Sequence, residues 1–157
     1  MKYLWAPWRM EYILKEKNEG CIFCEIPKEN QDKENYVLYR GKFCFVILNT
    51  YPYNNGHIMI APYDHIKNLE ELNRDTINEL MSLCQKSISV LKKKINPQGF
   101  NIGANIGKVG GAGILEHIHL HIVPRWQGDT NFMPVISDTK VMPQYLSETY
   151  DLLKAGF

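Results

Sequence analysis

The chain has 157 residues, of which 22% are charged and 45% hydrophobic, and its formal net charge is +1. This length and composition are typical of one globular domain with a sizeable core, and the near-zero charge argues against nucleic acid or a membrane surface as a partner. No apolar run approaches the ~20 residues of a membrane span, and the N-terminal MKYLWAPWRM lacks the features of a signal peptide, so we expect a cytoplasmic protein.

The first chemical signal along the chain is the C-x-x-C pair formed by Cys21 and Cys24. In a reducing compartment this spacing indicates metal or redox chemistry rather than a structural disulfide. No second C-x-x-C follows, and no predicted strand precedes the pair as a redox motif would require. The pair is therefore a candidate for half of a metal site. Cys44 and Cys84 lie in apolar patterns and are predicted to be buried thiols.

Short strands are predicted over residues 36–39, 42–48 and 57–61. The largely apolar run at 42–48 is typical of a central strand, and the Asn-, Pro- and Gly-rich turn after it predicts an antiparallel hairpin with 57–61.

The segment between Ile77 and Ile95 repeats apolar residues at three- and four-residue steps, which predicts an amphipathic helix. Asn73 or Asp75 can cap its N-terminus, and the segment 96–99 should end it. A fourth strand is predicted over 100–104, and a C-terminal helix over 144–154.

Three histidines, His117, His119 and His121, alternate with apolar residues in the segment EHIHLHIVPR. This is the period of a half-buried strand, so the three imidazoles should share one face, and Pro124 should end the strand pairing. A glycine-rich loop over 105–113 precedes them and can aim backbone N–H groups at an anion.

Such a row of imidazoles fits two kinds of site. One is a metal site, and the other is a phosphate site in which one imidazole is the nucleophile and the others donate hydrogen bonds. There is no G-x-G-x-x-G between a strand and a helix and no G-K-[ST], so neither a Rossmann nor a Walker site is indicated.

The segment HIHLHIV matches the motif H-φ-H-φ-H-φ-φ, with φ apolar, and the chain resembles the histidine triad (HIT) superfamily. Asn49, the pair Gly56-His57, the helix and Asn105-x-Gly107 precede the triad in the family order. The segments WAPWR, LNTYPYNNGH and PRWQGDTNF are most similar to the branch of the fragile histidine triad hydrolases and the bacterial diadenosine tetraphosphate phosphorylases.

The resemblance implies an α+β, HIT-like fold with an antiparallel sheet of about five strands and one main helix. It implies a single HIT domain over residues 1–157, with an N-terminal extension at 1–30 and a C-terminal tail at 126–157. Family members usually form homodimers, so we expect a homodimer. A tetramer built through the aromatic N-terminus is the alternative.

The resemblance also implies a mechanism. His119 would attack the α-phosphorus of a nucleotide to give a covalent nucleotidyl-histidine, which water, phosphate or another acceptor then resolves. The implied contacts are to the phosphate from His57, His121, Asn105 and Gly113, to the ribose from Asn49, and to the base from Ile47 and Phe45.

The chain departs from the hydrolase pattern at Gly113, where those enzymes carry a Gln, and at the following Ile114. The missing side-chain donor leaves room for an incoming phosphate, which favours phosphorolysis of dinucleoside polyphosphates. The alternatives are a dinucleoside polyphosphate or nucleoside phosphoramidate hydrolase, an enzyme with a catalytic metal on the triad, and a non-catalytic nucleotide-binding module.

Several relatives bind zinc through a C-x-x-C pair, a histidine after a strand and the first histidine of the triad. In this chain those positions are Cys21, Cys24, His65 and His117. The resemblance therefore implies a closed, structural Zn²⁺ site, and no organic cofactor is expected.

Overall fold

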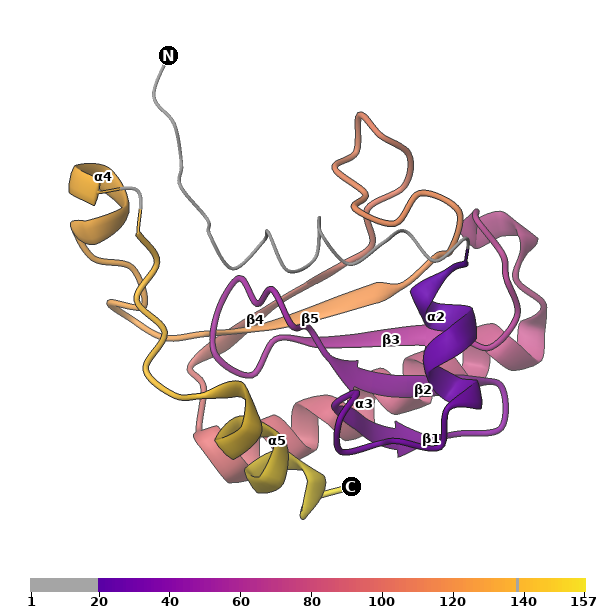
Figure 1. Ribbon diagram of the computed structural model, residues 1–157, viewed down its shortest axis with the longest axis horizontal. Coiled ribbons are helices and arrows are strands. Elements are labelled where there is room, and N and C mark those ends of the chain that lie inside the picture. The colour runs from indigo at the N-terminus through magenta and orange to yellow at the C-terminus, as the bar shows by residue number, and fades with distance from the viewer. Residues whose placement is uncertain (1–19, 138) are drawn as a thin grey trace.

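The computed structural model describes residues 20–137 and 139–157, so the aromatic N-terminus and its expected role in assembly lie outside the described residues. Five strands form one sheet in the order β1-β2-β3-β5-β4, and every neighbouring pair is antiparallel (Figure 1). The strands are β1 (Val37–Arg40), β2 (Cys44–Leu48), β3 (Ile58–Pro62), β4 (Gly99–Gly103) and β5 (Leu120–Arg125). The helices are α2 (Ile22–Glu25), α3 (Arg74–Ile95), α4 (Met133–Ser137) and α5 (Leu146–Lys154), with short 3₁₀ turns η1 (Ile26–Lys28) and η2 (Leu69–Glu71).

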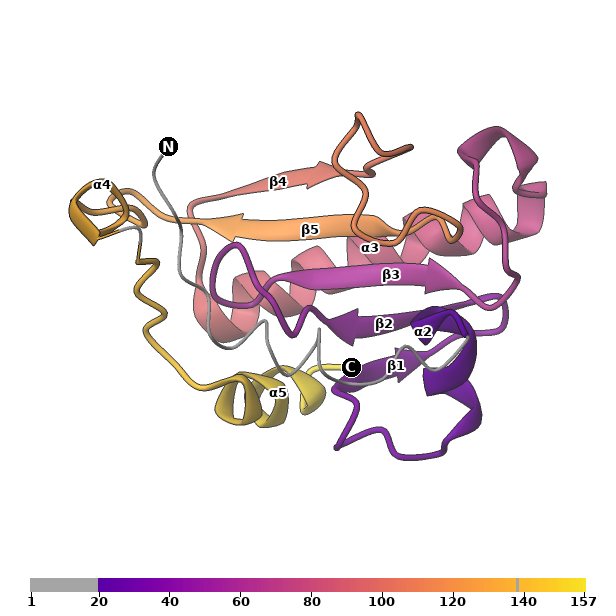
Figure 2. The same cartoon turned by 45° about the horizontal axis from the view of Figure 1, so that its top comes forward.

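The predicted α+β architecture is confirmed. Strands β2 and β3 form the expected hairpin, with Cys44 opposite Pro62 and Leu48 opposite Ile58. Strand β5, which carries the end of the histidine segment, lies between β3 and β4. Segments far apart in the chain therefore meet along β5, as Figure 2 shows.

Helix α3 crosses one face of the sheet (Figure 2). It begins after Asn73, whose side chain accepts a hydrogen bond from the Thr76 N–H, and it ends before Asn96, which adopts a φ of +46°. The buried face of the helix includes Leu83 and Val90, whereas Met81, which the periodicity placed in the apolar stripe, is half exposed.

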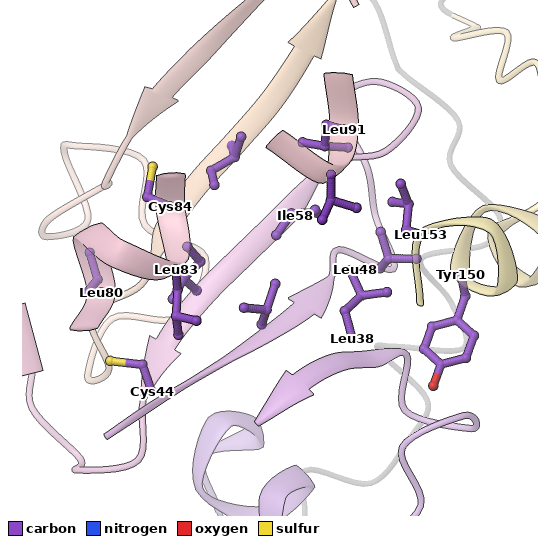
Figure 3. Close-up of a cluster of buried hydrophobic side chains, with 14 of the residues drawn as sticks. Leu38, Cys44, Leu48, Ile58, Leu80, Leu83, Cys84, Leu91, Tyr150 and Leu153 are labelled. Atoms are coloured by element: carbon purple, nitrogen blue, oxygen red, sulfur yellow. The ribbon is translucent and has the colours of Figure 1, made fainter. Parts of the chain in front are cut away.

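The main hydrophobic core fills the space between α3, α5 and the sheet (Figure 3). Tyr150 and Leu153 of α5 close one end of this core, as the predicted C-terminal helix required. Cys44 and Cys84 are buried in it, as expected.

A second, smaller cluster lies on the opposite face of the sheet, beneath α2. Its buried members are Phe23, Val37, Phe45, Ile47, Met59 and Ala61. The histidine side chains occupy the same face, so α2 and its two flanking cysteines are brought over the sheet beside them.

Strand pairing in the histidine segment differs from the prediction at both ends. β5 begins only at Leu120, so His117 and His119 precede the ladder, and it continues through Pro124 to Arg125. Pairing with β3 stops at Ile122, and the Pro124 carbonyl accepts a hydrogen bond from Asn54 on that side. Because the proline nitrogen faces the side where the ladder has already ended, its missing N–H breaks no pair.

Helix α4 was not predicted and stands away from the sheet (Figure 1). None of the helices in the described ranges is both long and apolar enough to span a bilayer.

Candidate active site and metal-binding group

Four imidazoles gather on the face of the sheet opposite α3. Their exposed fractions are 0% for His57, 1% for His117, 4% for His119 and 9% for His121. His57 directly precedes β3, which pairs with β5, and its ring centroid lies 5.1 Å from that of His121. The structure thus brings together the nucleophile His119 and the phosphate contacts His57 and His121 that the resemblance implied.

The protonation pattern of His119 follows from its hydrogen bond. Its Nδ1 lies 2.9 Å from the main-chain oxygen of His117. A carbonyl oxygen can only accept, so His119 Nδ1 carries the proton and donates it. In a neutral ring, Nε2 then keeps its lone pair, which is the form a nucleophilic imidazole needs.

A second chain of hydrogen bonds fixes His121 through His57. The backbone N–H of Tyr53 donates to His57 Nδ1 at 3.0 Å, so the proton of a neutral His57 is on Nε2. That Nε2–H donates to His121 Nδ1 at 2.9 Å. The proton of His121 is therefore on its own Nε2, where it is available to a ligand oxygen.

The pKa values agree with neutral imidazoles at pH 7. Burial lowers the pKa of His57 to about 3, and the neighbouring His121 and His119 add to this effect. Burial, followed by the charge of His119, lowers the pKa of His121 to about 4. Burial also lowers the pKa of His119, although its bond to the His117 carbonyl acts in the opposite direction.

A candidate metal-binding group lies at the other end of the histidine segment. One ligand atom from each of Cys21, Cys24, His65 and His117 lies within 4.8 Å of the others. His117 Nε2 donates to the Pro62 carbonyl at 2.9 Å, which leaves the lone pair on its Nδ1. That Nδ1 lies 3.2 Å from the sulfur of Cys21 and 3.6 Å from that of Cys24.

These spacings fit a tetrahedral ion. Sulfur and nitrogen ligands around zinc are expected roughly 3.5 Å apart, and the His65 Nδ1–Cys24 Sγ distance is 3.2 Å. Burial and the adjacent Cys21 thiol raise the pKa of Cys24 to about 11. A bound divalent cation would reverse that shift, because a coordinating thiol is deprotonated.

The residues predicted to contact the nucleotide differ in how well the structure places them for that role. Asn49 lies beside the imidazoles, with its side-chain nitrogen 3.4 Å from His57 Nδ1. A Cβ built on Gly113 would meet nothing within 4 Å, so there is room at that position. Asn105 bonds weakly to the Gly111 carbonyl at 3.5 Å, within the glycine-rich loop. Ile47 is only 3% exposed and offers almost no open surface to a base, and the same holds for Phe45.

The sequence interpretation missed two groups that contact the imidazoles of the candidate active site. The Phe23 ring packs against His119 at a centroid distance of 4.8 Å, and its place between the two cysteines was the available signal. The Tyr53 N–H had no signal, because any residue except proline supplies a backbone donor.

Comparison with known proteins gives consistent matches. The sequence model of the HIT domain matches residues 30–128. The chain is 42% identical to a Mycobacterium tuberculosis protein named AP-4-A phosphorylase, over 98% of this chain and 83% of that protein.

Among solved structures, a zinc-bound histidine triad family protein from Mycobacterium smegmatis superposes with a TM-score of 0.70 at 26% identity. The match covers 88% of this chain and 93% of the other. A hypothetical histidine triad nucleotide-binding protein from Sulfolobus tokodaii gives a TM-score of 0.68 at 31% identity, over 87% and 88% of the two chains.

Proposed function

Since the chain belongs to the HIT family, we propose that it is an enzyme that cleaves dinucleoside polyphosphates, of the diadenosine tetraphosphate phosphorylase type. The relative named AP-4-A phosphorylase supports this substrate class, because its similarity extends over 98% of the chain. The observation that carries the chemistry is the hydrogen bond from His119 Nδ1 to the His117 carbonyl, which leaves Nε2 unprotonated.

In the proposed reaction, His119 Nε2 attacks the α-phosphorus of one nucleotide. A phosphorus–nitrogen bond forms, and the phosphorus–oxygen bond to the rest of the substrate breaks, which releases ATP from diadenosine tetraphosphate. An oxygen of inorganic phosphate then attacks the adenylyl-histidine, and the products are ADP and the free imidazole. The covalent step replaces one difficult displacement with two easier ones.

The other imidazoles would stabilise charge during both displacements. The Nε2–H of His121 is the available donor to the phosphoryl oxygens, and His57 holds it in that form. Donors arranged in advance around developing negative charge are commonly the largest catalytic contribution. The open space at Gly113 supports phosphate as the acceptor, since a side chain there would narrow the approach.

The experiment is product analysis of diadenosine tetraphosphate with and without inorganic phosphate. ADP plus ATP formed only with phosphate is the expected result. AMP plus ATP irrespective of phosphate would mean hydrolysis, and the interpretation of Gly113 would be wrong.

The His119→Asn variant tests the nucleophile. We expect it to fold and to lose turnover, whereas Lys92→Met, on the exposed surface of α3, should keep both. A His119→Asn enzyme that retained a substantial share of its activity would contradict the covalent mechanism.

We further propose that the metal-binding group holds structural Zn²⁺. The support is the fit of its four ligand atoms and the zinc-bound family structure from Mycobacterium smegmatis. When bound, the ion would tie the residues before β1 to those beside β5 and keep the two thiols deprotonated. Metal analysis of the purified protein and of Cys24→Ser tests this proposal.

Self-association is proposed as well. Strand β4 forms one edge of the sheet, and Ile102 on it is 47% exposed. An open edge strand with apolar side chains is a surface that pairs readily with a second copy. Light scattering tests for a dimer.

The unpaired cysteines are consistent with a reducing compartment, and we propose the cytoplasm.

A further inference from the structure

A hollow of about 400 Å³ lies next to the imidazoles on the same face of the sheet. Its lining includes Tyr53, Val123, Arg125 and Lys140, and none of these four side chains is assigned to the chemistry above. The hollow borders His57 and His121 through the Tyr53 ring, and its lining carries two cationic side chains.

The hollow exists because β4 presents little side chain to this face. Gly103 pairs with His121 and Gly99 pairs with Arg125, and a Cβ built on either glycine would meet nothing within 4 Å. Asn101, between them, pairs with Val123, whose nearly buried side chain lies on the same face of the sheet. The strip of sheet beyond His121 is therefore left open by the sequence of β4.

Two cations and one carboxylate lie around the hollow, and the Arg125 guanidinium is paired with the Asp129 carboxylate and also donates to Asn101 Oδ1. The Asp129 side chain is 8% exposed, and its carboxylate accepts hydrogen bonds from Arg125, Asn54 and the Trp126 N–H. The Arg125 side chain is 49% exposed. Lys140 Nζ is held 2.8 Å from the Asp129 main-chain oxygen. Arg125 and Lys140 thus line the hollow together with Asp129, and one positive charge is left in excess.

The hollow is continuous with the proposed phosphate site. Tyr53 lines it, and the same ring, 57% exposed, stacks on His121 at a centroid distance of 5.8 Å. Along β5, residues His121, Val123 and Arg125 follow one another on one face at steps of ~6.6 Å. A ligand held by His121 and extended along β5 would therefore reach Arg125.

We propose that this hollow binds the leaving part of the substrate, the polyphosphate chain beyond the phosphorus that His119 attacks. The inference deepens the proposed function and rests on it. The leaving group of a dinucleoside tetraphosphate carries several negative charges, and Arg125 and Lys140 supply charge-assisted hydrogen bonds for such oxygens. The same chemistry would suit an incoming inorganic phosphate, so the experiment must separate the two.

The test compares two substrates with the same adenylyl group. Diadenosine tetraphosphate has an anionic leaving group, whereas the p-nitrophenyl ester of AMP has none beyond the phenolate. We expect Lys140→Met to lower kcat/KM for the tetraphosphate about tenfold, a typical effect of losing one charged hydrogen bond, mostly through KM. The ester should be cleaved as by the wild type, and the matched control Lys92→Met should affect neither substrate.

Each other outcome would overturn the subsite. Equal losses on both substrates, together with a lower melting temperature, would give Lys140 a structural role. A rise in the KM for inorganic phosphate alone would make the hollow the acceptor site, and unchanged kinetics would leave it without a ligand. The proposed function fails separately, if the wild type cleaves neither substrate or if His119→Asn remains active.

Discussion

Acidification from pH 7 to pH 4 is expected to destabilise the fold, with His57 as a principal cause. The ring is fully buried, its Nδ1 faces the Tyr53 N–H, and its Nε2–H is committed to His121. A second proton would have to enter at Nδ1, where it would meet a donor rather than an acceptor. Protonation of His57 therefore requires both burial of a charge and loss of a hydrogen bond.

The sign and size follow from the two pKa values. The pKa of His57 is about 3 in the folded chain and 6.5 for an ordinary histidine. Between these values the unfolded chain binds more protons, so the free energy of unfolding is highest above pH 6.5 and falls as the pH drops. Each pH unit below 6.5 is worth about 1.4 kcal/mol, which gives a loss of about 3 kcal/mol at pH 4. The lowered pKa of His121 acts in the same direction.

The assay is urea unfolding of the wild type and of His57→Gln at pH 7 and pH 4. Both series contain excess chelator, so that proton competition for metal ligands does not contribute. The Gln side chain can still accept the Tyr53 N–H but does not titrate. We expect the variant to lose about 3 kcal/mol less than the wild type between the two pH values. Equal losses in the two proteins would refute the assignment to His57.

Three further results are expected. The Glu79 carboxylate accepts hydrogen bonds from the backbone N–H groups of residues 42–44, so Glu79→Ala should lower the free energy of unfolding in urea by about 3 kcal/mol. The exposed control Glu70→Ala should lower it by almost nothing. Similar values for both variants would show that these three hydrogen bonds do not stabilise the fold. Phe23→Leu should lower kcat at temperatures where the variant is still folded, because the Phe23 ring packs on His119. An unchanged kcat would show that this contact does not contribute to catalysis. Chelation should lower the melting temperature of the wild type but not of Cys24→Ser, and an equal shift in both would place the metal elsewhere.

The elements with a clear period were predictable from the sequence. The α3 repeat, its Asn73 cap and the β2–β3 hairpin are local, since each depends on residues close together in the chain. The exposed Met81 shows the limit of such periods. The sheet, and not the period alone, decides which apolar positions of the helix are buried. Helix α4 has only five residues, which is too few to show an apolar period, so it could not be predicted from the sequence.

The candidate site was predictable in its residues but not in its protonation. The resemblance named the imidazoles and the four members of the metal-binding group. The proton positions depend on acceptors and donors that the fold supplies from elsewhere, such as the Pro62 carbonyl beside His117 and the Tyr53 N–H beside His57. A sequence lists side chains, but every residue carries the same carbonyl and almost every residue the same N–H. The partners that decide a tautomer therefore leave no mark in it.

His117 connects the two halves of the site in a way that neither half shows alone. Its Nδ1 faces the cysteine sulfurs, its Nε2–H is bound to the Pro62 carbonyl, and its own main-chain oxygen accepts the Nδ1–H of His119. The ring that would hold the metal and the carbonyl that orients the proposed nucleophile thus belong to one residue. Because β-strand pairing begins only at Leu120, no ladder fixes that carbonyl. Its position depends instead on the anchored His117 ring and on the backbone bond from the Ile118 N–H to the Ile66 carbonyl. A metal at this group would therefore act on the reaction through geometry, by holding the acceptor that keeps His119 Nε2 unprotonated.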